Sequence, residues 1–422
     1  MNSAVKVYFG TPQFELSGVN TLNANLIRAL QKRGIEAAFL ITGPLNQDYY
    51  PLAYDDDLPL IHLESDRSLD LKKRWQSVID FLETHAPCIY VPGYDYQISC
   101  ISSALSDRVG ILGVLYSDED LHYDHVLRLG AFWNKIIGIS DYITYRVKRD
   151  QPDSASRVIQ IPCGVPDPGP IDRCYTSTRP IRLVYAGRLI QYQKRIMDLV
   201  AITRQLKKES IPYHLTVIGD GPERELLMKS WTNEISGGQV EIRSGVSHKA
   251  TLESFKNQDV FLLPSEFEGL PLALLEAMAA GCIPVVADIR SGIPELIESG
   301  TNGWIVKTGN SRDWAGIIGR LHRRPELAGD ASRRAVQMVR DKKMMIDSVA
   351  DSYRSVLLEI YDQIIHHRFQ RRLAPIYLPV YLNDDRVMVS MLKKIGKRVQ
   401  KHCRFLQSSG FVGFIRRIVG MG

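Results

Sequence analysis

The chain has 422 residues, more than one hydrophobic core usually supports, so its length predicts two domains. Its 45% hydrophobic and 24% charged residues exclude a collagen-like, disordered or disulfide-scaffold chain. Nine of the 53 Lys and Arg residues follow Asp385 with no acidic residue among them, which leaves 44 bases against 47 acids in residues 1–385. The net charge of +6 therefore resides in the C-terminal tail.

The ends of the chain and its cysteines bear on where the protein works. The start MNSAVKVYFG has no basic segment followed by a long apolar stretch, so we predict a strand there and not a secretory signal. No run approaches ~18 apolar residues, so no membrane-spanning helix is expected. The six cysteines show no C-x-x-C spacing, which favours reduced thiols in a cytosolic protein. They are Cys88, Cys100, Cys163, Cys174, Cys282 and Cys403.

In the first half of the chain, short apolar runs alternate with helical stretches. Strands are predicted over 5–10, 36–41, 88–93, 110–116, 135–140 and 157–162, and helices over 20–34 and 69–85. Apolar runs without polar alternation are typical of strands buried on both faces of a parallel sheet. Residues 1–165 are therefore predicted to form a Rossmann-like domain.

The second half repeats the pattern after a linker at 166–180, within a stretch dense in Pro, Gly and small polar residues. Strands are predicted over 181–187, 214–219, 240–245, 259–265, 283–287 and 303–306, and helices from Lys194, from Pro222, and near 270–280, 311–320 and 326–364. We assign 181–345 to a second Rossmann-like domain, 346–364 to a return helix and 365–422 to a basic amphipathic tail. Two doubly wound α/β domains predict a cleft between them.

The most informative segment is PSEFEGLPLALLEAMAAGCIPVVA, over 264–287. Glu268 ends a strand-to-helix loop, and Glu276 follows on the helix after seven residues. Gly269 permits a close approach of the backbone to a ligand, and helix N-terminal amides suit a diphosphate. If the two glutamates are considered alone, the pattern is explained equally well by one glutamate that caps the helix and one that is exposed to solvent.

The full string EGLPLALLEAMAAG over 268–281, followed by a PVV strand, resembles the retaining glycosyltransferases of family 4, which have the GT-B fold. The resemblance implies that 1–165 is the acceptor domain and that 181–345 is the nucleotide-sugar donor domain. Within the latter, it implies that Glu268 contacts the donor sugar and that Glu276 contacts the ribose hydroxyls. It also implies that the amides of Gly269 and Leu270 touch the phosphate region.

A second segment, LVYAGRLIQYQKRIMDLV over 183–200, places Arg188 after a strand that ends at Gly187. Lys194 and Arg195 are predicted to open a helix. Two cations at a strand end suit a leaving diphosphate, although exposed basic residues at a helix start are the common alternative. The resemblance implies that Arg188 and Lys194 stabilise the departing nucleoside diphosphate. Arg195 stands where the family often has Gly.

Weaker similarities extend the resemblance along the chain. Gly219 and Gly221 match a G-x-G-P turn, which is also common in plain strand–helix turns. Residues 242–255 resemble the loop that holds the nucleobase through backbone groups near Ser244, Gly245 and Val246. Residues 291–306 resemble a stretch that supplies phosphate-side or structural glycines, and 161–166 resemble the domain junction. In 14–34, Gly18 is implied to lie near the β-phosphate.

The acceptor side departs from the family, whose usual cleft His is replaced by Tyr116-Ser117-Asp118. We expect Asp118 to be a polar cleft residue. His122 and His125 could substitute for the missing His, but core or surface histidines are more common. The acids at 118–120 and 55–57 have the D-x-D form of metal-binding glycosyltransferases, yet helix caps and loops explain them more simply. Arg188 and Lys194 supply the charge that a metal would, so we predict neither metal nor cofactor; the nucleotide sugar is a co-substrate.

Residues 388–406 form an amphipathic pattern with one apolar and one basic face. The apolar face holds Met388, Met391, Leu392, Ile395, Val399, Cys403 and Leu406, and the basic face holds Lys393, Lys394, Lys397, Arg398, Lys401 and Arg404. Such a helix either lies on an anionic membrane surface or docks on the first domain. The combination of apolar and basic residues continues up to Arg417. The membrane reading implies a lipid-linked acceptor. Nucleic-acid binding is disfavoured, because aromatic residues do not interleave with the bases.

The sequence therefore predicts a retaining, metal-independent glycosyltransferase that uses a UDP- or GDP-sugar and a glycan, polysaccharide-precursor or lipid-linked acceptor. It would be cytoplasmic, or peripheral on the inner face of the membrane. The alternatives are a non-catalytic nucleotide-sugar-binding or scaffold protein, and a sugar epimerase of the same fold. A dinucleotide oxidoreductase is disfavoured, because the first strand ends FGTPQFELSG and lacks G-x-G-x-x-G.

Overall fold

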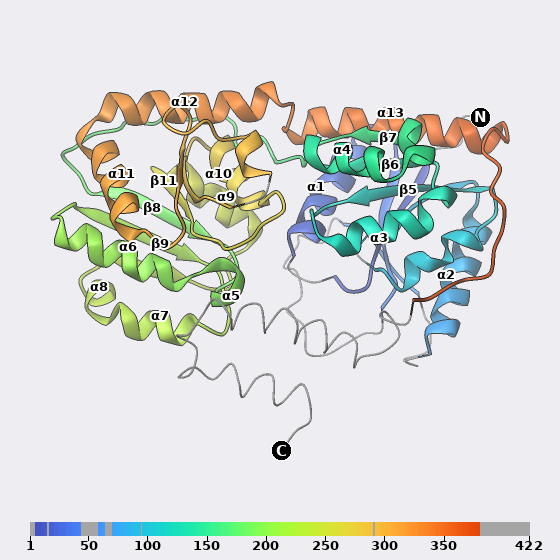
Figure 1. The fold of residues 1–422 in the computed structure, drawn as a ribbon, viewed down its shortest axis with the longest axis horizontal. Coiled ribbons are helices and arrows are strands. Elements are labelled where there is room, and N and C mark those ends of the chain that lie inside the picture. Colours follow the sequence, from blue (N-terminus) through green and yellow to red (C-terminus); the bar gives the residue numbers. More distant parts are fainter. Residues whose placement is uncertain are drawn as a thin grey trace, which may run out of the picture.

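The computed structural model describes residues 5–14, 17–43, 58–63, 70–93, 95–289 and 292–379. Within these ranges the chain forms two α/β domains that lie side by side, each built on one parallel sheet (Figure 1). The acids at 55–57 and the amphipathic segment 388–417 fall outside the described residues, so both remain predictions from the sequence.

The first domain is built on a sheet whose described strands follow the order β3-β2-β1-β4-β5-β6-β7. The strands are β1 Lys6–Thr11, β2 Glu36–Ile41, β3 Leu60–His62, β4 Cys88–Val91, β5 Val109–Leu115, β6 Lys135–Gly138 and β7 Val158–Gln160. The helices are α1 Gly18–Gln31, α2 Leu71–His85, α3 Asp120–Leu129 and α4 Asp141–Asp150, with 3-10 helices η1 Ile98–Ser103, η2 Gly130–Phe132 and η3 Pro152–Arg157. The strand order reverses between β1 and β4, the place where doubly wound sheets open a crevice for ligands.

The second domain repeats this topology with the order β10-β9-β8-β11-β12-β13. Its strands are β8 Ile181–Ala186, β9 Tyr213–Ile218, β10 Val240–Arg243, β11 Val260–Leu263, β12 Ile283–Ala287 and β13 Trp304–Val306. The helices are α5 Gln191–Lys194, α6 Met197–Lys208, α7 Arg224–Ser230, α8 Thr232–Ser236, α9 His248–Lys256, α10 Leu272–Ala279, η4 Ile293–Glu295, α11 Ser311–Arg323, α12 Pro325–Asp341 and α13 Ile346–Ile365. The reversal lies between β8 and β11, so their carboxyl ends are where a ligand is expected.

The last helix, α13, follows the second domain in sequence but packs on the first (Figure 1). A Cβ placed on Gly110 would lie 2.5 Å from Cγ2 of Ile360, so glycine in β5 is what allows α13 to lie directly on the sheet. At the surface, Arg33 pairs with Asp347 and Asp351 at 3.0 and 2.7 Å. The first domain is thus completed by a helix that comes from the far end of the described chain.

The helical stretch predicted over 326–364 is two helices, and the break has a clear cause. Val165, on the chain that leaves the first domain, hydrogen-bonds through its backbone to Met344 and Ile346. Backbone groups paired in this way cannot continue a helical ladder. The outgoing and returning segments therefore meet at one junction between the domains.

Two findings bear on the expectations about compartment and membrane. No helix in the described ranges is both long and apolar enough to cross a membrane. Five cysteines fall within those ranges and all are free thiols, of which four are buried and Cys174 is exposed. Burial raises the pKa of Cys163 to about 12, so this thiol is unreactive at neutral pH.

Candidate active site

The carboxyl ends of β8 and β11 bring the two most informative motifs together. Lys194 ends α5, which follows β8, and Glu268 lies in the loop after β11. The Lys194 Nζ donates to Oε1 of Glu268 over 2.6 Å, and the hydroxyl of Ser265 donates to the same oxygen over 2.6 Å. The two charged side chains are only 15% and 6% exposed. A desolvated ion pair at the ligand-binding edge of a doubly wound sheet is the centre of the candidate site.

The prediction that Lys194 and Arg195 open a helix is wrong. Lys194 is the last residue of α5, and Arg195 ends that helix in the left-handed conformation, at φ 46° and ψ 43°. This conformation costs an L-residue roughly 1–2 kcal/mol, which accounts for the glycine expected here from the resemblance. The Arg195 guanidinium pairs with Asp198 at 2.9 Å and with Glu266 at 2.8 Å, and these contacts hold the unfavourable backbone in place.

The loops after β8 and β9 pack backbone against backbone. A Cβ on Gly219 would lie 1.9 Å from the carbonyl oxygen of Gly187, and one on Gly221 would lie 2.4 Å from that of Leu189. This packing alone accounts for glycine at positions 219 and 221. The contacts to a nucleotide that the resemblance implies for these glycines stay a prediction.

Two of the predicted phosphate-binding residues are exposed. Arg188 follows Gly187 and donates from Nη2 to Oε1 of Gln193 over 3.0 Å. Gly18 is the first residue of α1, and the Ser17 side chain caps this helix by accepting from a backbone N–H. Both the Arg188 guanidinium and the start of α1 are thus open to an anion.

Glu276 lies on α10 with its side chain 5% exposed, and its carboxylate contacts His248, which is 17% exposed. The atoms Nε2 of His248 and Oε1 of Glu276 are 2.6 Å apart. His248 is the first residue of α9 and follows Ser247, the N-cap, directly after the loop at 244–246. His248 therefore connects two parts that the resemblance implies separately. One is the loop at 244–246, implied to hold the nucleobase, and the other is Glu276, implied to hold the ribose.

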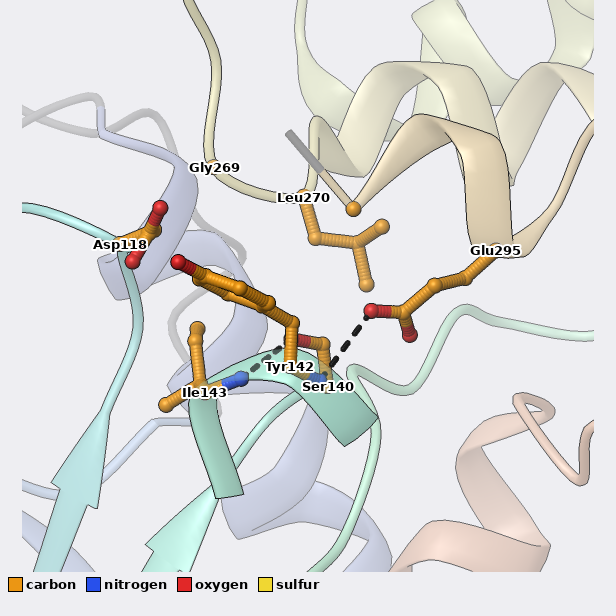
Figure 2. Close-up of a pocket in the computed structure, with 8 residues that line it drawn as sticks. Asp118, Ser140, Tyr142, Ile143, Gly269, Leu270 and Glu295 are labelled. Atoms are coloured by element: carbon orange, nitrogen blue, oxygen red, sulfur yellow. Dashed lines mark hydrogen bonds between the residues drawn. The ribbon is translucent and has the colours of Figure 1, made fainter. Parts of the chain in front are cut away.

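A cavity of about 230 Å³ lies between the two domains (Figure 2). The first domain contributes Asp118, Ser140, Tyr142 and Ile143 to its lining, and the second contributes Gly269, Leu270, Gly292 and Glu295. Three predicted site residues from the two halves of the chain, Asp118, Gly269 and Leu270, therefore meet here. A Cβ on Gly269 would lie 3.2 Å from the carbonyl oxygen of Tyr116, so the loop after Glu268 approaches the first domain closely.

Glu295 connects the domains across this cavity (Figure 2). Its carboxylate accepts from the backbone N–H groups of Asp141 and Tyr142, each over 3.3 Å. These groups belong to the first turn of α4, where the hydroxyl of Ser140 also accepts from the N–H of Ile143. A negative charge at a helix N-terminus is favourable, so a residue of the second domain stabilises a helix of the first.

Asp118 is held in place by two neighbours of the first domain. It accepts from the Tyr123 hydroxyl over 2.7 Å and from Nη1 of Arg146 over 3.1 Å. Nη2 of Arg146 reaches Asp120 over 2.7 Å, so a guanidinium joins the two outer acids of the D-x-D string. Within the described ranges no group of three or more His, Cys, Asp and Glu side chains could hold a metal ion.

His122 and His125 are core residues of α3 and are absent from the lining of the cavity. His122 Nε2 lies 2.9 Å from the hydroxyl of Tyr96. Burial lowers the pKa of His122 to about 4 and, with help from Arg128, that of His125 to about 3. Both rings are therefore neutral at physiological pH, and neither is placed to act on an acceptor in this cavity.

Sequence reasoning did not single out His248, Tyr142 or Glu295. Each lies in or next to a segment that was interpreted for another reason. His248 lies in 242–255, Tyr142 follows the strand predicted at 135–140, and Glu295 lies in the glycine-containing stretch 291–306. Their importance comes from partners that are distant in sequence, which only the fold reveals.

Parts of this chain are similar in sequence to known glycosyltransferases. Residues 176–338 match the family Glycosyl transferases group 1. The chain is 34% identical over 153 residues to the amylovoran biosynthesis glycosyltransferase AmsK of Erwinia amylovora. The aligned residues cover 34% of this chain and 36% of that protein. It is 32% identical over 147 residues to the lipopolysaccharide 1,6-galactosyltransferase of Salmonella typhimurium, 34% of this chain and 40% of that protein. The match thus spans well under half the length of these curated relatives.

The similarity of fold extends over both domains. The structure of the pneumococcal O-GlcNAc transferase GtfA in complex with UDP and GlcNAc aligns with 85% of this chain and 99% of its own, with a TM-score of 0.67 at 13% identity. At that identity the comparison concerns the fold alone. Residues 176–338 thus match the glycosyl transferases of group 1, and the two-domain architecture is that of the GT-B fold.

Proposed function

We propose that this chain is a retaining, metal-independent glycosyltransferase, which moves a sugar from a nucleoside diphosphate sugar to an acceptor hydroxyl. The observation that carries the proposal is the desolvated Lys194–Glu268 pair at the carboxyl edge of the second sheet. Directly after Glu268, Gly269 and Leu270 line the cavity that the first domain closes from the other side.

In the proposed reaction the bond between the sugar C1 and the diphosphate oxygen breaks, and a bond from C1 to the acceptor oxygen forms. Negative charge grows on the departing diphosphate, which takes up the proton that the acceptor hydroxyl loses. Lys194 and the exposed Arg188 offset this charge, an effect that is strong where water is excluded. Glu268 orients the sugar and keeps the Lys194 ammonium in place. Retention of configuration is implied by the family resemblance.

We further propose that the donor is a UDP- or GDP-sugar and that the acceptor is a glycan, a polysaccharide precursor or a lipid-linked sugar. The GtfA structure contains UDP, and the two relatives described above are named for amylovoran biosynthesis and for lipopolysaccharide. From the sequence pattern of 388–417 we propose that the protein is cytoplasmic and binds an anionic membrane surface peripherally.

A donor panel tests the proposal. Release of nucleoside diphosphate from UDP-, GDP- and ADP-sugars is measured for the full chain and for Glu268→Gln, which keeps the shape of the side chain. We expect one donor to be turned over and the variant to be slower by roughly 10²-fold or more. Glu209→Gln, at the exposed end of α6 and away from the site, is the control and should stay within about threefold, the factor that ~0.6 kcal/mol gives.

The remaining outcomes distinguish the alternatives. Conversion of a donor into an isomer without an acceptor would identify an epimerase. Binding of a nucleotide sugar without release or transfer, even with glycan acceptors present, would favour the non-catalytic scaffold. If no nucleotide sugar binds, the proposed function is wrong.

A further inference from the structure

We propose that His248 is a positioning residue, which holds the Glu276 carboxylate in the orientation that recognises the ribose of the donor nucleotide. The assignment rests on the proposed function and deepens it, because it names the residue that controls recognition of the nucleotide's sugar hydroxyls. The observation behind it is the 2.6 Å contact between Nε2 of His248 and Oε1 of Glu276.

The direction of this hydrogen bond follows from the chemistry of the two groups. A carboxylate oxygen accepts hydrogen bonds, so the proposal requires the tautomer of His248 that carries its proton on Nε2. A short hydrogen bond to a charged acceptor is among the stronger ones in proteins. Both side chains are largely buried, which limits competition from water.

The contact matters because a glutamate carboxylate is otherwise free to turn. Its terminal torsion has a broad, roughly two-fold preference, so an unrestrained Glu276 would sample many orientations. A donor bound to Oε1 fixes the plane of the carboxylate. Of about four lone-pair positions on the group, His248 occupies one, and the others can accept from two neighbouring hydroxyls.

The position of His248 in the chain gives the contact a second effect. His248 begins α9, the Ser247 side chain caps that helix by accepting from Ala250 N–H, and Gly245 in the preceding loop has φ 67°. The residues implied to hold the base and the residue implied to hold the ribose are thereby kept in one fixed arrangement. A rigid arrangement of this kind reduces the entropy that the nucleotide loses on binding.

The test compares ribose and deoxyribose ligands by calorimetry on the full chain. UDP and GDP are titrated together with their 2′-deoxy and 3′-deoxy analogues. In the wild type we expect the ribonucleotide to bind about tenfold more tightly than either analogue, as loss of one hydrogen bond to a charged group implies. In His248→Leu the affinity for the ribonucleotide should fall about tenfold, to the level of the analogues, whose own affinity changes little.

Rescue and control variants separate positioning from stability. His248→Gln can place an N–H near the same point and should restore the discrimination, whereas the shorter His248→Asn should not. Lys249→Gln, at the next and exposed position of α9, is the control and should discriminate as the wild type does. In donor turnover, His248→Leu should raise KM with little change in kcat, the signature of lost ground-state binding.

Three results would overturn the assignment, and they are distinguishable. Wild-type discrimination retained in both His248→Leu and His248→Asn would make His248 a structural partner of Glu276. Equal binding of ribose and deoxyribose ligands by the wild type would show that Glu276 does not recognise the ribose, and would leave the proposed function standing. If the wild type binds no nucleoside diphosphate, the proposed function itself fails.

Discussion

At the scale of single residues, Arg195 shows how this chain supports the loop beside its candidate catalytic pair. The residue is left-handed, which is unfavourable for any side chain with a Cβ, yet its guanidinium joins Asp198 in α6 to Glu266 in the loop after β11. Lys194, the residue before it, is thereby held against Glu268. The local backbone strain is offset by contacts that tie two loops of the site together.

Substitution of Arg195 separates these two contributions. Arg195→Gly and Arg195→Ala lose the same ion pairs, but only alanine keeps the cost of the left-handed backbone. We expect Arg195→Ala to be less stable than Arg195→Gly by about 1 kcal/mol, although glycine has the more flexible unfolded chain. Urea unfolding of the two variants measures the difference. If Arg195→Ala is instead the more stable variant, the strain at this position is negligible, because only the flexibility of the unfolded glycine chain then separates the two.

The residues of the site differ in how far the sequence could reveal them. Lys194, Glu268 and Glu276 were singled out from the sequence, because each lies in a short segment with a specific pattern, and their roles stay predictions. The Lys194–Glu268 contact joins positions 74 residues apart, and the His248–Glu276 contact joins positions 28 apart. Such pairings depend on which strands are neighbours in the sheet, which the spacing of a motif does not give.

At the scale of elements, α3 contains two histidines that are buried and neutral. His125 packs against the rings of Tyr96 and Trp133, with centroids 5.0 and 5.3 Å away. Within the described residues its Nε2 has no hydrogen-bond partner. Protonation would place a charge in this apolar setting, so the folded state resists it and the pKa of His125 is lowered to about 3.

This predicts loss of stability in acid. Above pH ~6.5 the histidines are neutral in the folded and the unfolded chain and contribute nothing to the pH dependence. Below it only the unfolded chain takes up protons, so the free energy of unfolding falls with pH until about 4 for His122 and about 3 for His125. We expect His125→Phe to remove about 2 kcal/mol of the stability lost between pH 7.5 and pH 5. Urea midpoints at the two pH values measure this, and an unchanged pH dependence would contradict it.

Strands marked by short apolar runs were predicted closely, and elements that depend on tertiary contacts were not. The strands at 36–41 and 283–287 agree with β2 and β12 residue for residue, because buried parallel strands have a distinctive composition. The helices α3, α4 and α9 were not predicted, since they are short and have few apolar residues. The return helix assigned to 346–364 begins where α13 begins, but the helical pattern over 326–364 does not reveal the break before it, because Val165, far away in sequence, imposes that break.

At the scale of the whole molecule, two domains with a cleft between them could be predicted, but the contacts that join the domains could not. Alternation of strands and helices on both sides of the linker is a local signal that is repeated many times. The cavity depends on how the domains meet, for example through Glu295 and Tyr142, which are 153 residues apart. No pattern within either half of the chain specifies that contact.

The basic tail gives a prediction for the whole molecule. If residues 388–417 bind membranes, the full chain should sediment with vesicles that contain an anionic phospholipid and not with neutral ones, and binding should weaken with added salt. Lys393→Gln, Lys394→Gln and Lys397→Gln combined should weaken binding, since each basic residue contributes about 1 kcal/mol near such a surface. If the full chain does not sediment with anionic vesicles even at low salt, the result would instead support docking of the tail on the first domain.

The place of α13 also determines the order in which the protein can be completed during synthesis. Val349, Tyr353, Leu357 and Ile360 belong to the apolar core of the first domain, yet roughly 200 residues separate them from β7. At translation rates of about 5–20 residues per second, the surface of β4 and β5 that α13 covers stays uncovered for about 10–40 s after its own strands have been made. The first domain to leave the ribosome is therefore the last to be finished, and during that interval its exposed sheet is the part of the molecule most in need of a chaperone.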